Sequence, residues 1–311
     1  MLWSRYGSAA TETENTGVQR LYRGILVALW IGFCSAAAVA VSFDYDASAP
    51  LMFSVDHART DGAVKVADVS FRSGDALVRA DLVVPERPQA RMPGVLFVHW
   101  LGDPATTNRS EFLADALWLA RRGVVSLLPD EPWSQLGWFE KVRAPATDAA
   151  DSRSEVISLR RSLDALLAVP GVDAARVAYV GHDFGAMYGA LLTAVDPRAS
   201  CRVYMTPTVT FAEWFLLDTT RPPADPAAYS AELGAFDIPA SLARAAGGAS
   251  LLQFASNDRY VPPDKARAFA GAVTGEKLAR TYDAGHDLAV TAATQDRRAW
   301  LASCLKVPAQ P

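Results

Sequence analysis

Three residues in the carboxyl-terminal half of the chain, Asp183, Asp258 and His286, could do chemistry together. Asp183 is the centre of the pentapeptide Gly181–Gly185 (GHDFG), which lies between a run typical of a buried strand (RVAYV) and a stretch of small residues typical of a helix. The two glycines would let strand and helix pass closely while the central residue occupies a strained turn. Such a turn presents the Asp183 side chain beside the amino end of the helix, whose dipole favours an anion. The pentapeptide therefore predicts a nucleophile.

The expected partners of the nucleophile follow it in the chain. LLQFASND ends a predicted strand at Asp258, and TYDAGHDL places His286 in a glycine-containing loop after the next strand. The order nucleophile, acid, histidine is the usual one when a turn of this kind supplies the nucleophile. His286 would then act as a base, and Asp258 would fix its tautomer. Asp264, Asp283 and Asp287 are competing acids, of which Asp264 is better explained as the amino-terminal residue of a helix.

Backbone N–H groups close to the nucleophile could stabilise negative charge during a reaction. Trp100 and Leu101 directly follow a second predicted buried strand, Val95–His99 (VLFVH). In this arrangement the loop after that strand offers one N–H, from Trp100 or Leu101, to an oxyanion. The residue after the nucleophile, Phe184, offers the second.

The three remaining histidines are interpreted without a chemical role. His99 would hold the loop that follows its strand, and His182 would support the turn from within. His57 lies in a predicted linker and is expected to have no role.

An aspartate nucleophile changes the reaction that the chain can perform. With a reference pKa near ~4, an aspartate side chain is already anionic at neutral pH and needs no base before it attacks. His286 is then free to activate water in a second step. Attack on an ester carbonyl would give an anhydride, whereas attack on a saturated carbon that bears a halide or an epoxide oxygen gives an ordinary ester. The nucleophile therefore favours alkyl transfer.

Three functions remain open on these residues. The first is a hydrolase of a small organic substrate that uses an Asp183–His286–Asp258 triad. The second is an esterase or lactonase in which Asp183 acts as a base on water. The third is a non-catalytic binding protein that has kept the same architecture.

The elements that must position these residues follow an α/β pattern. From residue 95 onwards strands alternate with helices, which predicts a mostly parallel central sheet with helices on both faces. Two alternating runs, AVKVADVSF and ALVRADLVV, come before it and predict an antiparallel hairpin. Trp133, Trp138 and Trp214 lie in segments that leave strands at the carboxyl edge, where ligands bind in such sheets. These three side chains are therefore candidates to line an apolar pocket.

Taken together, these segments resemble the dienelactone-hydrolase-like branch of the α/β-hydrolase superfamily over about residues 63–307. The resemblance rests on VLFVHWLGD, VVSLLPDEPW, SLRRSLDALLAVPGVDAARVAYVGHDFGAMYGALL, FASNDRYVPP and YDAGHDL, and it implies an α/β-hydrolase fold. The chain departs from that branch at Asp183, where Cys or Ser is usual, and at Trp100, where Glu is usual.

The GHDFG turn instead resembles the epoxide hydrolases and haloalkane dehalogenases, which use an Asp nucleophile. Those families carry a helical cap before the acid, and the stretch Thr208–Gly248 is short for a full cap. They also commonly have Trp after the nucleophile, where this chain has Phe184.

The first 61 residues are expected to lie outside this domain. Residues 24–43 carry no charge and are long enough to cross a bilayer as a helix. Arg20 and Arg23 precede them, so the positive-inside rule keeps the amino terminus in the cytoplasm and exports the rest, as a membrane-anchored or secreted protein. The predicted division is a cytoplasmic tail over 1–23, a transmembrane helix or signal sequence over 24–43, a linker over 44–61 and an α/β-hydrolase domain over 62–307.

Composition limits the partners. Of 311 residues, 50% are hydrophobic and 21% charged, the balance of a globular chain, and the net charge of −4 offers no basic field to nucleic acid. The expected partners are a small-molecule substrate and, through the N-terminal segment, a membrane. Cys201 and Cys304 match no zinc or redox motif, and no cofactor is expected. We expect two separate buried thiols, with a disulfide as the alternative that export would permit.

Overall fold

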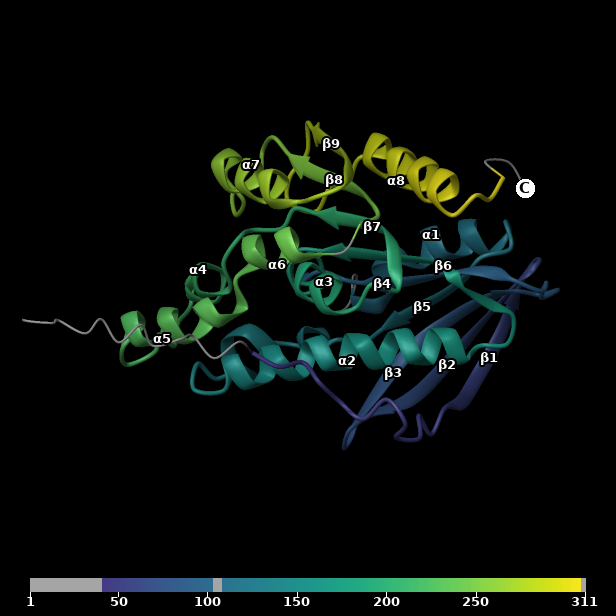
Figure 1. The fold of residues 1–311 in the computed structure, drawn as a ribbon, viewed down its shortest axis with the longest axis horizontal. Helices are drawn as coiled ribbons and strands as arrows, with labels where there is room; N and C mark the ends of the chain where they lie inside the picture. Colours follow the sequence, from purple (N-terminus) through teal and green to yellow (C-terminus); the bar gives the residue numbers. More distant parts are fainter. Residues whose placement is uncertain (1–40, 103–107, 246, 309–311) are drawn as a thin grey trace, which may run out of the picture. The chain divides into compact units, whose positions relative to one another are not determined.

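The structure, a computed structural model, describes residues 41–308 except 103–107 and 246. Its strands form one sheet in the order β1-β2-β3-β5-β4-β6-β7-β8-β9 (Figure 1). The strands are β1 (Ser54–Asp61), β2 (Val64–Ser73), β3 (Ala76–Pro85), β4 (Met92–Val98), β5 (Val125–Pro129), β6 (Val172–His182), β7 (Ala199–Met205), β8 (Ala249–Ala255) and β9 (Glu276–Tyr282). The first three strands pair antiparallel and β3 joins β5 antiparallel. From β5 across to β9 all neighbours are parallel, which confirms the predicted α/β class and its antiparallel opening.

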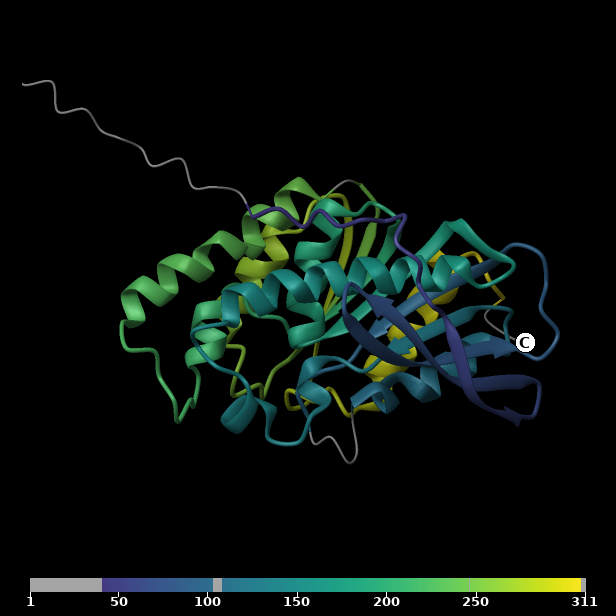
Figure 2. The same cartoon turned by 90° about the horizontal axis from the view of Figure 1, so that it is seen from below.

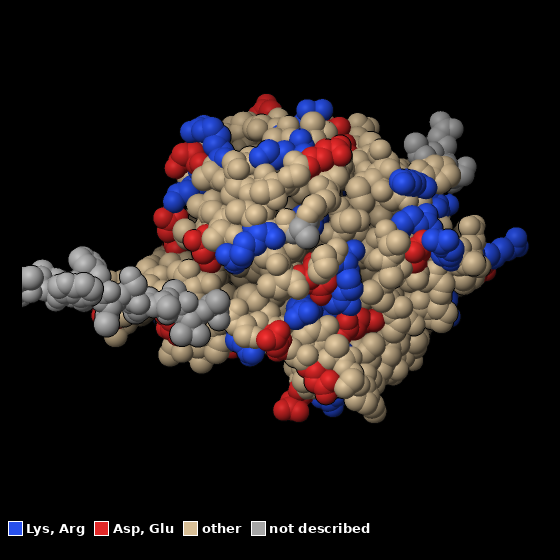
Figure 3. Space-filling view, in the orientation of Figure 1, with Lys and Arg blue, Asp and Glu red and all other residues tan. Residues whose placement is uncertain are grey.

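Helices cover both faces of the sheet. One face carries α2 (Asp148–Ala168), α3 (Phe184–Val195), α6 (Ile238–Arg244) and α7 (Pro263–Ala272), and the other carries α1 (Leu113–Ala120) and α8 (Thr291–Cys304). Figure 2 looks from the α2 side and shows α2 in front of the sheet and α8, in yellow, behind it. Helix α3 has no charged residue and is buried along almost its whole length, as expected of a helix that is apolar all round. On the face seen in Figure 3, basic and acidic side chains are interspersed.

The parallel strands bring the predicted site residues to one edge. Strand β4 ends just before Trp100 and Leu101, and β6 ends just before Asp183. Strands β8 and β9 end just before the loops that carry Asp258 and His286. Since all four strands point the same way, these residues meet at the carboxyl edge of the sheet.

Part of the predicted linker over residues 44–61 belongs to this domain. Strand β1 pairs with β2 along its length. Before it, Tyr45 donates to Asp164 at 2.9 Å, and the Arg161 guanidinium donates to the backbone oxygen of Ala49 at 2.9 Å. Every residue of β1 is exposed, so the strand lacks the alternation of apolar and polar residues that would have marked it in the sequence.

The predicted cytoplasmic tail and almost all of the predicted membrane segment lie outside the described residues. Within the part of the chain that the structure describes, no helix is both long enough and apolar enough to cross a membrane.

The stretch Thr208–Gly248 forms short helices rather than a large separate cap. These are α4 (Phe211–Leu216), α5 (Pro226–Leu233), a 3-10 turn (Gly234–Phe236) and α6. Side chains of α4, including Trp214, are buried, and the Trp214 ring packs against Phe184 at the start of α3. The stretch therefore supplies part of the wall of the site.

Cys201 and Cys304 form a disulfide with a Cα–Cα distance of 6.0 Å. The expectation of two separate thiols was wrong, and the alternative holds. Cys201 lies near the start of β7 and Cys304 ends α8, so both lie at the edge opposite the site. The bond closes a separation of 103 residues, for which loop entropy in the unfolded chain corresponds to about 4–5 kcal/mol.

Candidate active site

The turn at Asp183 has the backbone conformation that the sequence predicts. Asp183 has φ 54° and ψ −115°, outside the regions that residues with side chains ordinarily occupy. A Cβ on Gly181 would lie 2.4 Å from the backbone oxygen of Gly185, and one on Gly185 would lie 2.3 Å from that of Val98. Only glycine fits at both positions. The strands β4 and β6 and the helix α3 therefore pack closely enough to hold Asp183 in its strained turn.

His286 and Asp258 form the expected acid–histidine pair. His286 Nδ1 lies 2.8 Å from Asp258 Oδ2, and the imidazole and the carboxylate are both nearly buried. Asp258 Oδ1 accepts from the N–H groups of Tyr260 and Val261 at 2.8 and 3.0 Å. Burial acts to raise the pKa of Asp258, but the hydrogen bond and charge of His286 and the two N–H groups outweigh it and lower the pKa. Asp258 is thus held as an anion that donates no proton.

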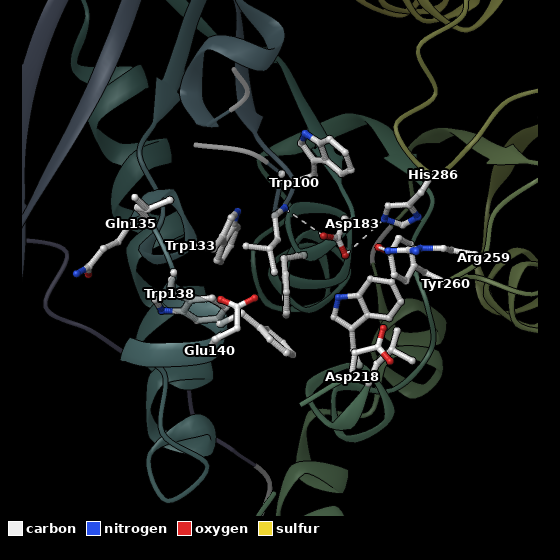
Figure 4. A pocket seen from close by; sticks show the side chains of 18 residues that line it. Trp100, Trp133, Gln135, Trp138, Glu140, Asp183, Asp218, Arg259, Tyr260 and His286 are labelled. Atoms are coloured by element: carbon white, nitrogen blue, oxygen red, sulfur yellow. Dashed lines mark hydrogen bonds and ion pairs between the residues drawn. The ribbon is translucent and has the colours of Figure 1, made fainter. Parts of the chain in front are cut away.

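The two oxygens of Asp183 have different surroundings (Figure 4). Oδ2 accepts from the Leu101 N–H at 3.1 Å. Oδ1 lies 4.0 Å from His286 Nε2, and neither atom has a hydrogen-bond partner among the described residues. One carboxylate oxygen is therefore anchored, and the other is free to react within reach of a histidine.

Burial sets the protonation of Asp183. Desolvation is the largest effect and raises the pKa of the carboxyl to about 7, with smaller upward contributions from Glu111 and Asp258. The charge of His286 and the Leu101 N–H act in the opposite direction. Near neutral pH this carboxyl is therefore poised between its acid and anionic forms.

Of the two residues predicted as alternatives for the first oxyanion donor, Trp100 and Leu101, the structure favours Leu101. The Trp100 N–H donates to Glu111 Oε2 at 2.9 Å and is not free for a reacting group. The Leu101 N–H points at the nucleophile instead. Phe184 is the first residue of α3, so its N–H has no acceptor within the helix and remains the second candidate. The Trp100 side chain packs beside His286 instead, with the centroids of the two rings 5.9 Å apart.

Two of the other three histidines, His182 and His99, lie next to the site. His182 Nδ1 lies 2.7 Å from Glu111 Oε1. His182 Nε2 lies 2.9 Å from the backbone oxygen of His286. His99 Nε2 accepts from the Glu131 N–H at 3.2 Å, and burial lowers the pKa of His99. His57 is exposed on β1. Glu111 was not identified from the sequence, since nothing in NRSEF distinguishes it from a solvent-exposed glutamate.

The competing acids have other partners. Asp264 lies in the first turn of α7, as predicted. Asp283 accepts from the side-chain amide of Asn257 at 2.7 Å, and Asp287 accepts from the Ala289 N–H at 3.2 Å. Among these carboxylates it is Asp258 that reaches His286.

A cavity of about 800 Å³ opens over Asp183 and His286. The three tryptophans proposed as pocket residues, Trp133, Trp138 and Trp214, all line it, and Phe184 contacts each of their rings at centroid distances of 5.4–6.3 Å. The lining that the sequence did not indicate is Gly102, Gln135, Leu136, Gly137, Phe139, Glu140, Leu217, Asp218, Arg259 and Tyr260. Figure 4 shows Trp133 and Trp138 on one side of the Asp183 carboxylate and His286, Tyr260 and Arg259 on the other. The cavity suits an apolar organic molecule of small to moderate size.

Within the described ranges, no group of three or more His, Cys, Asp or Glu side chains is arranged to bind a metal ion. The chemistry available to the described residues is that of a buried carboxylate, an imidazole and backbone donors.

The sequence matches no protein-family model and no curated protein. Among solved structures it is similar to an acetyl xylan esterase from a Paenibacillus species, with a TM-score of 0.68 and 18% identity over 83% of this chain and 90% of that one. An acetyl xylan esterase from a Thermoanaerobacterium species matches with a TM-score of 0.64 and 16% identity over 82% and 88% of the two chains. A protein from Klebsiella pneumoniae assigned as a dienelactone hydrolase matches with a TM-score of 0.56 and 16% identity, over 79% of this chain and 99% of that one. The chain therefore has the α/β-hydrolase fold that its motifs predicted.

Proposed function

We propose that this protein is a hydrolase in which Asp183 attacks a saturated carbon of a small organic substrate. The observation that carries the proposal is the difference between the two carboxylate oxygens: the Leu101 N–H donates to Oδ2, whereas Oδ1 has no hydrogen-bond partner in the part of the chain that the structure describes. A carboxylate held in this way is oriented for attack through one oxygen. The solved structures of similar fold are named as esterases and hydrolases, which supports hydrolysis as the class of reaction.

The reaction would proceed in two displacements. In the first, Oδ1 forms a bond to the substrate carbon, and the bond from that carbon to a halide or an epoxide oxygen breaks, with the electron pair leaving on that atom. In the second, His286 Nε2 removes a proton from water, and the hydroxide attacks Cγ of Asp183. The Leu101 N–H, already on Oδ2, would stabilise the oxyanion that forms there, together with the Phe184 N–H. Collapse breaks the bond between Cγ and Oδ1, and the departing oxygen takes the proton held by His286 to give the alcohol. The carboxyl group that remains contains one oxygen from water and loses its proton to solvent.

The second candidate is an esterase or lactonase in which Asp183 acts as a base on water. The names of the similar structures favour acyl chemistry, and a pKa of about 7 suits a general base. In that mechanism no covalent enzyme ester forms. The two candidates therefore predict different fates for the oxygen atoms of Asp183.

A single turnover in ¹⁸O-labelled water distinguishes the candidates. A panel of haloalkanes, epoxides, lactones and aryl esters first identifies a substrate, which is then turned over with enzyme in excess. If Asp183 is the nucleophile, the label enters the peptide that contains Asp183 and not the product, because the product takes its oxygen from the carboxylate. The peptide that contains Asp258 is the internal control and should stay unlabelled. Label in the product alone would reject the nucleophile and support the base.

We also propose that the domain is exported and held at, or released from, a membrane. The uncharged residues 24–43 after Arg20 and Arg23 support this, and so does the Cys201–Cys304 disulfide, since such bonds persist in oxidising compartments. Fusing a reporter that is active only outside the cytoplasm after Ala49 tests the proposal. A well-expressed but inactive reporter would contradict it.

A further inference from the structure

A buried carboxylate–imidazole pair, Glu111 and His182, lies directly behind the proposed nucleophile. His182 is the last residue of β6 and is fully buried. Glu111 belongs to the 3-10 turn Asn108–Phe112 that precedes α1, and its side chain is largely buried. Glu111 Oε1 and His182 Nδ1 are 2.7 Å apart. The pair takes no direct part in the two displacements proposed above.

The neighbours of His182 determine how many protons its ring carries. Nε2 lies 2.9 Å from the carbonyl oxygen of His286, which can only accept, so Nε2 must carry a hydrogen. Nδ1 faces a Glu111 oxygen at a distance typical of a charge-assisted hydrogen bond. The other Glu111 oxygen accepts from the Trp100 N–H at 2.9 Å, which favours the ionised carboxylate. With Glu111 ionised, both ring nitrogens carry hydrogen and His182 is an imidazolium.

The surroundings of His182 suit a positive charge. The indole of Trp100 stacks on the imidazole with ring centroids 5.1 Å apart and planes 9° apart, and an aromatic face attracts a cation. Among the described residues, the titratable groups nearby are the acidic Glu111 and Asp183, and the histidines His99 and His286. The carboxylate of Glu111 is the group in direct contact with the ring, so it supplies the counter-charge.

We propose that Glu111 and His182 are an ion pair whose two members are positioning residues for the reaction. Glu111 fixes the Trp100 N–H, so that the next N–H, that of Leu101, meets Asp183. His182 fixes the backbone carbonyl of His286, whose side chain faces the same carboxylate. One ion pair thereby ties together the loop after β4, the turn after β6 and the loop after β9. Its effect on turnover rests on the proposed function, whereas its charge state does not.

Nuclear magnetic resonance of protein labelled with ¹⁵N-histidine tests the charge state. The chain has only four histidines, so removing each in turn assigns the signals. We expect the His182 ring to carry hydrogen on both nitrogens at neutral pH, because both nitrogens face acceptors. Its signals should vanish in His182→Gln. In Glu111→Gln the buried ring loses its counter-ion and should lose a proton. A singly protonated His182 in the unaltered protein at neutral pH would overturn the ion pair.

Steady-state kinetics per active site test the positioning role. Glu111→Gln should lower kcat by about 10²-fold, the cost of misplacing an oxyanion donor, while KM stays within about threefold. Glu86→Gln is the matched control, since Glu86 is exposed in the loop after β3. A purely structural role would reduce the amount of folded enzyme and leave kcat per active site unchanged, which would overturn the positioning role. If no substrate in the panel turns over, the proposed function fails, while the resonance experiment still decides the ion pair.

Discussion

Asp183 and Asp258 are both aspartates and lie at the same edge of one sheet, yet their surroundings shift their pKa values in opposite directions. Asp258 accepts from two backbone N–H groups and pairs with His286, and its pKa is lowered. Among the described residues, Asp183 accepts a hydrogen bond from the Leu101 N–H alone, and its pKa is raised to about 7 because the carboxyl is more deeply desolvated. Desolvation raises the pKa of Asp183, whereas the donors around Asp258 outweigh the effect of its burial and lower its pKa.

This contrast separates an anchor from a reactive group. A carboxylate that accepts three hydrogen bonds, as Asp258 does, is stabilised as an anion and is a poor nucleophile, so Asp258 suits the task of orienting His286. A carboxylate with one bare oxygen is destabilised in the free enzyme and gains by forming a bond. The turn at Asp183 holds backbone strain and an unsatisfied oxygen at the same residue. Stability is given up at this residue in a way that suits the proposed attack.

The largest expected effect is on turnover. Asp183→Asn should lower kcat/KM by at least about 10⁴-fold, since an amide cannot displace a leaving group. Asp258→Asn should cost less, about 10²–10⁴-fold, because His286 is still present but poorly oriented. Initial rates with a substrate from the panel measure both. A larger loss in Asp258→Asn than in Asp183→Asn would reverse the assigned roles.

The second prediction separates the two chemical steps. His286→Gln leaves the Asp183 carboxylate able to attack but removes the base for water, so kcat should fall by about 10²–10⁴-fold. The covalent enzyme ester should then accumulate and add the mass of the alkyl group to the intact protein. His57→Gln, at an exposed position on β1, is the control and should give no adduct. Normal turnover in His286→Gln would remove this residue from the mechanism.

The third prediction uses the pKa of Asp183. Only its anion can attack, so kcat/KM should rise with pH and level off above about pH 7. One unit below that pKa the rate should be about tenfold lower. Measuring kcat/KM between about pH 5 and pH 9 checks this. A profile that is flat down to about pH 5 would mean that Asp183 has an ordinary pKa and that the contrast with Asp258 is absent.

The smallest expected effect is on the free energy of unfolding, and its sign differs between the two residues. The pKa of Asp183 is raised in the folded state, so the protein loses stability as pH rises from about 4 to about 7. Asp183→Asn should therefore stabilise the protein above pH 7, on the order of 1–3 kcal/mol.

Asp258 has a lowered pKa, so its contribution is present above the unfolded pKa and is lost as pH falls through the folded one. Asp258→Asn should destabilise the protein at neutral pH by about 1–3 kcal/mol, because buried donors lose their acceptor. Urea unfolding at about pH 8 measures both variants. If both substitutions changed the free energy of unfolding with the same sign, the surroundings of Asp183 and Asp258 would affect their carboxylates alike.

Much of the site could be predicted from the sequence because its signals are local. The glycines on either side of Asp183 are needed by a turn of five residues, and the strands that precede Asp258 and His286 are marked by their own apolar runs. Because parallel strands end at one edge, the chain order alone placed these three side chains together. The α/β class followed from the same alternation of strands and helices.

The remainder was decided by contacts between distant segments, which leave no local pattern. Glu111 takes the Trp100 N–H and leaves that of Leu101 for Asp183, and a single sequence does not show which of two adjacent donors is used. Strand β1 is held by pairing with β2 rather than by burial of its own side chains, so it has no hydrophobic signature. The disulfide depends on a Cα–Cα distance that only the packing of α8 against the sheet determines. The residue types fixed the chemistry that is possible, and the tertiary structure decided which atoms are paired and which oxygen of Asp183 is left free.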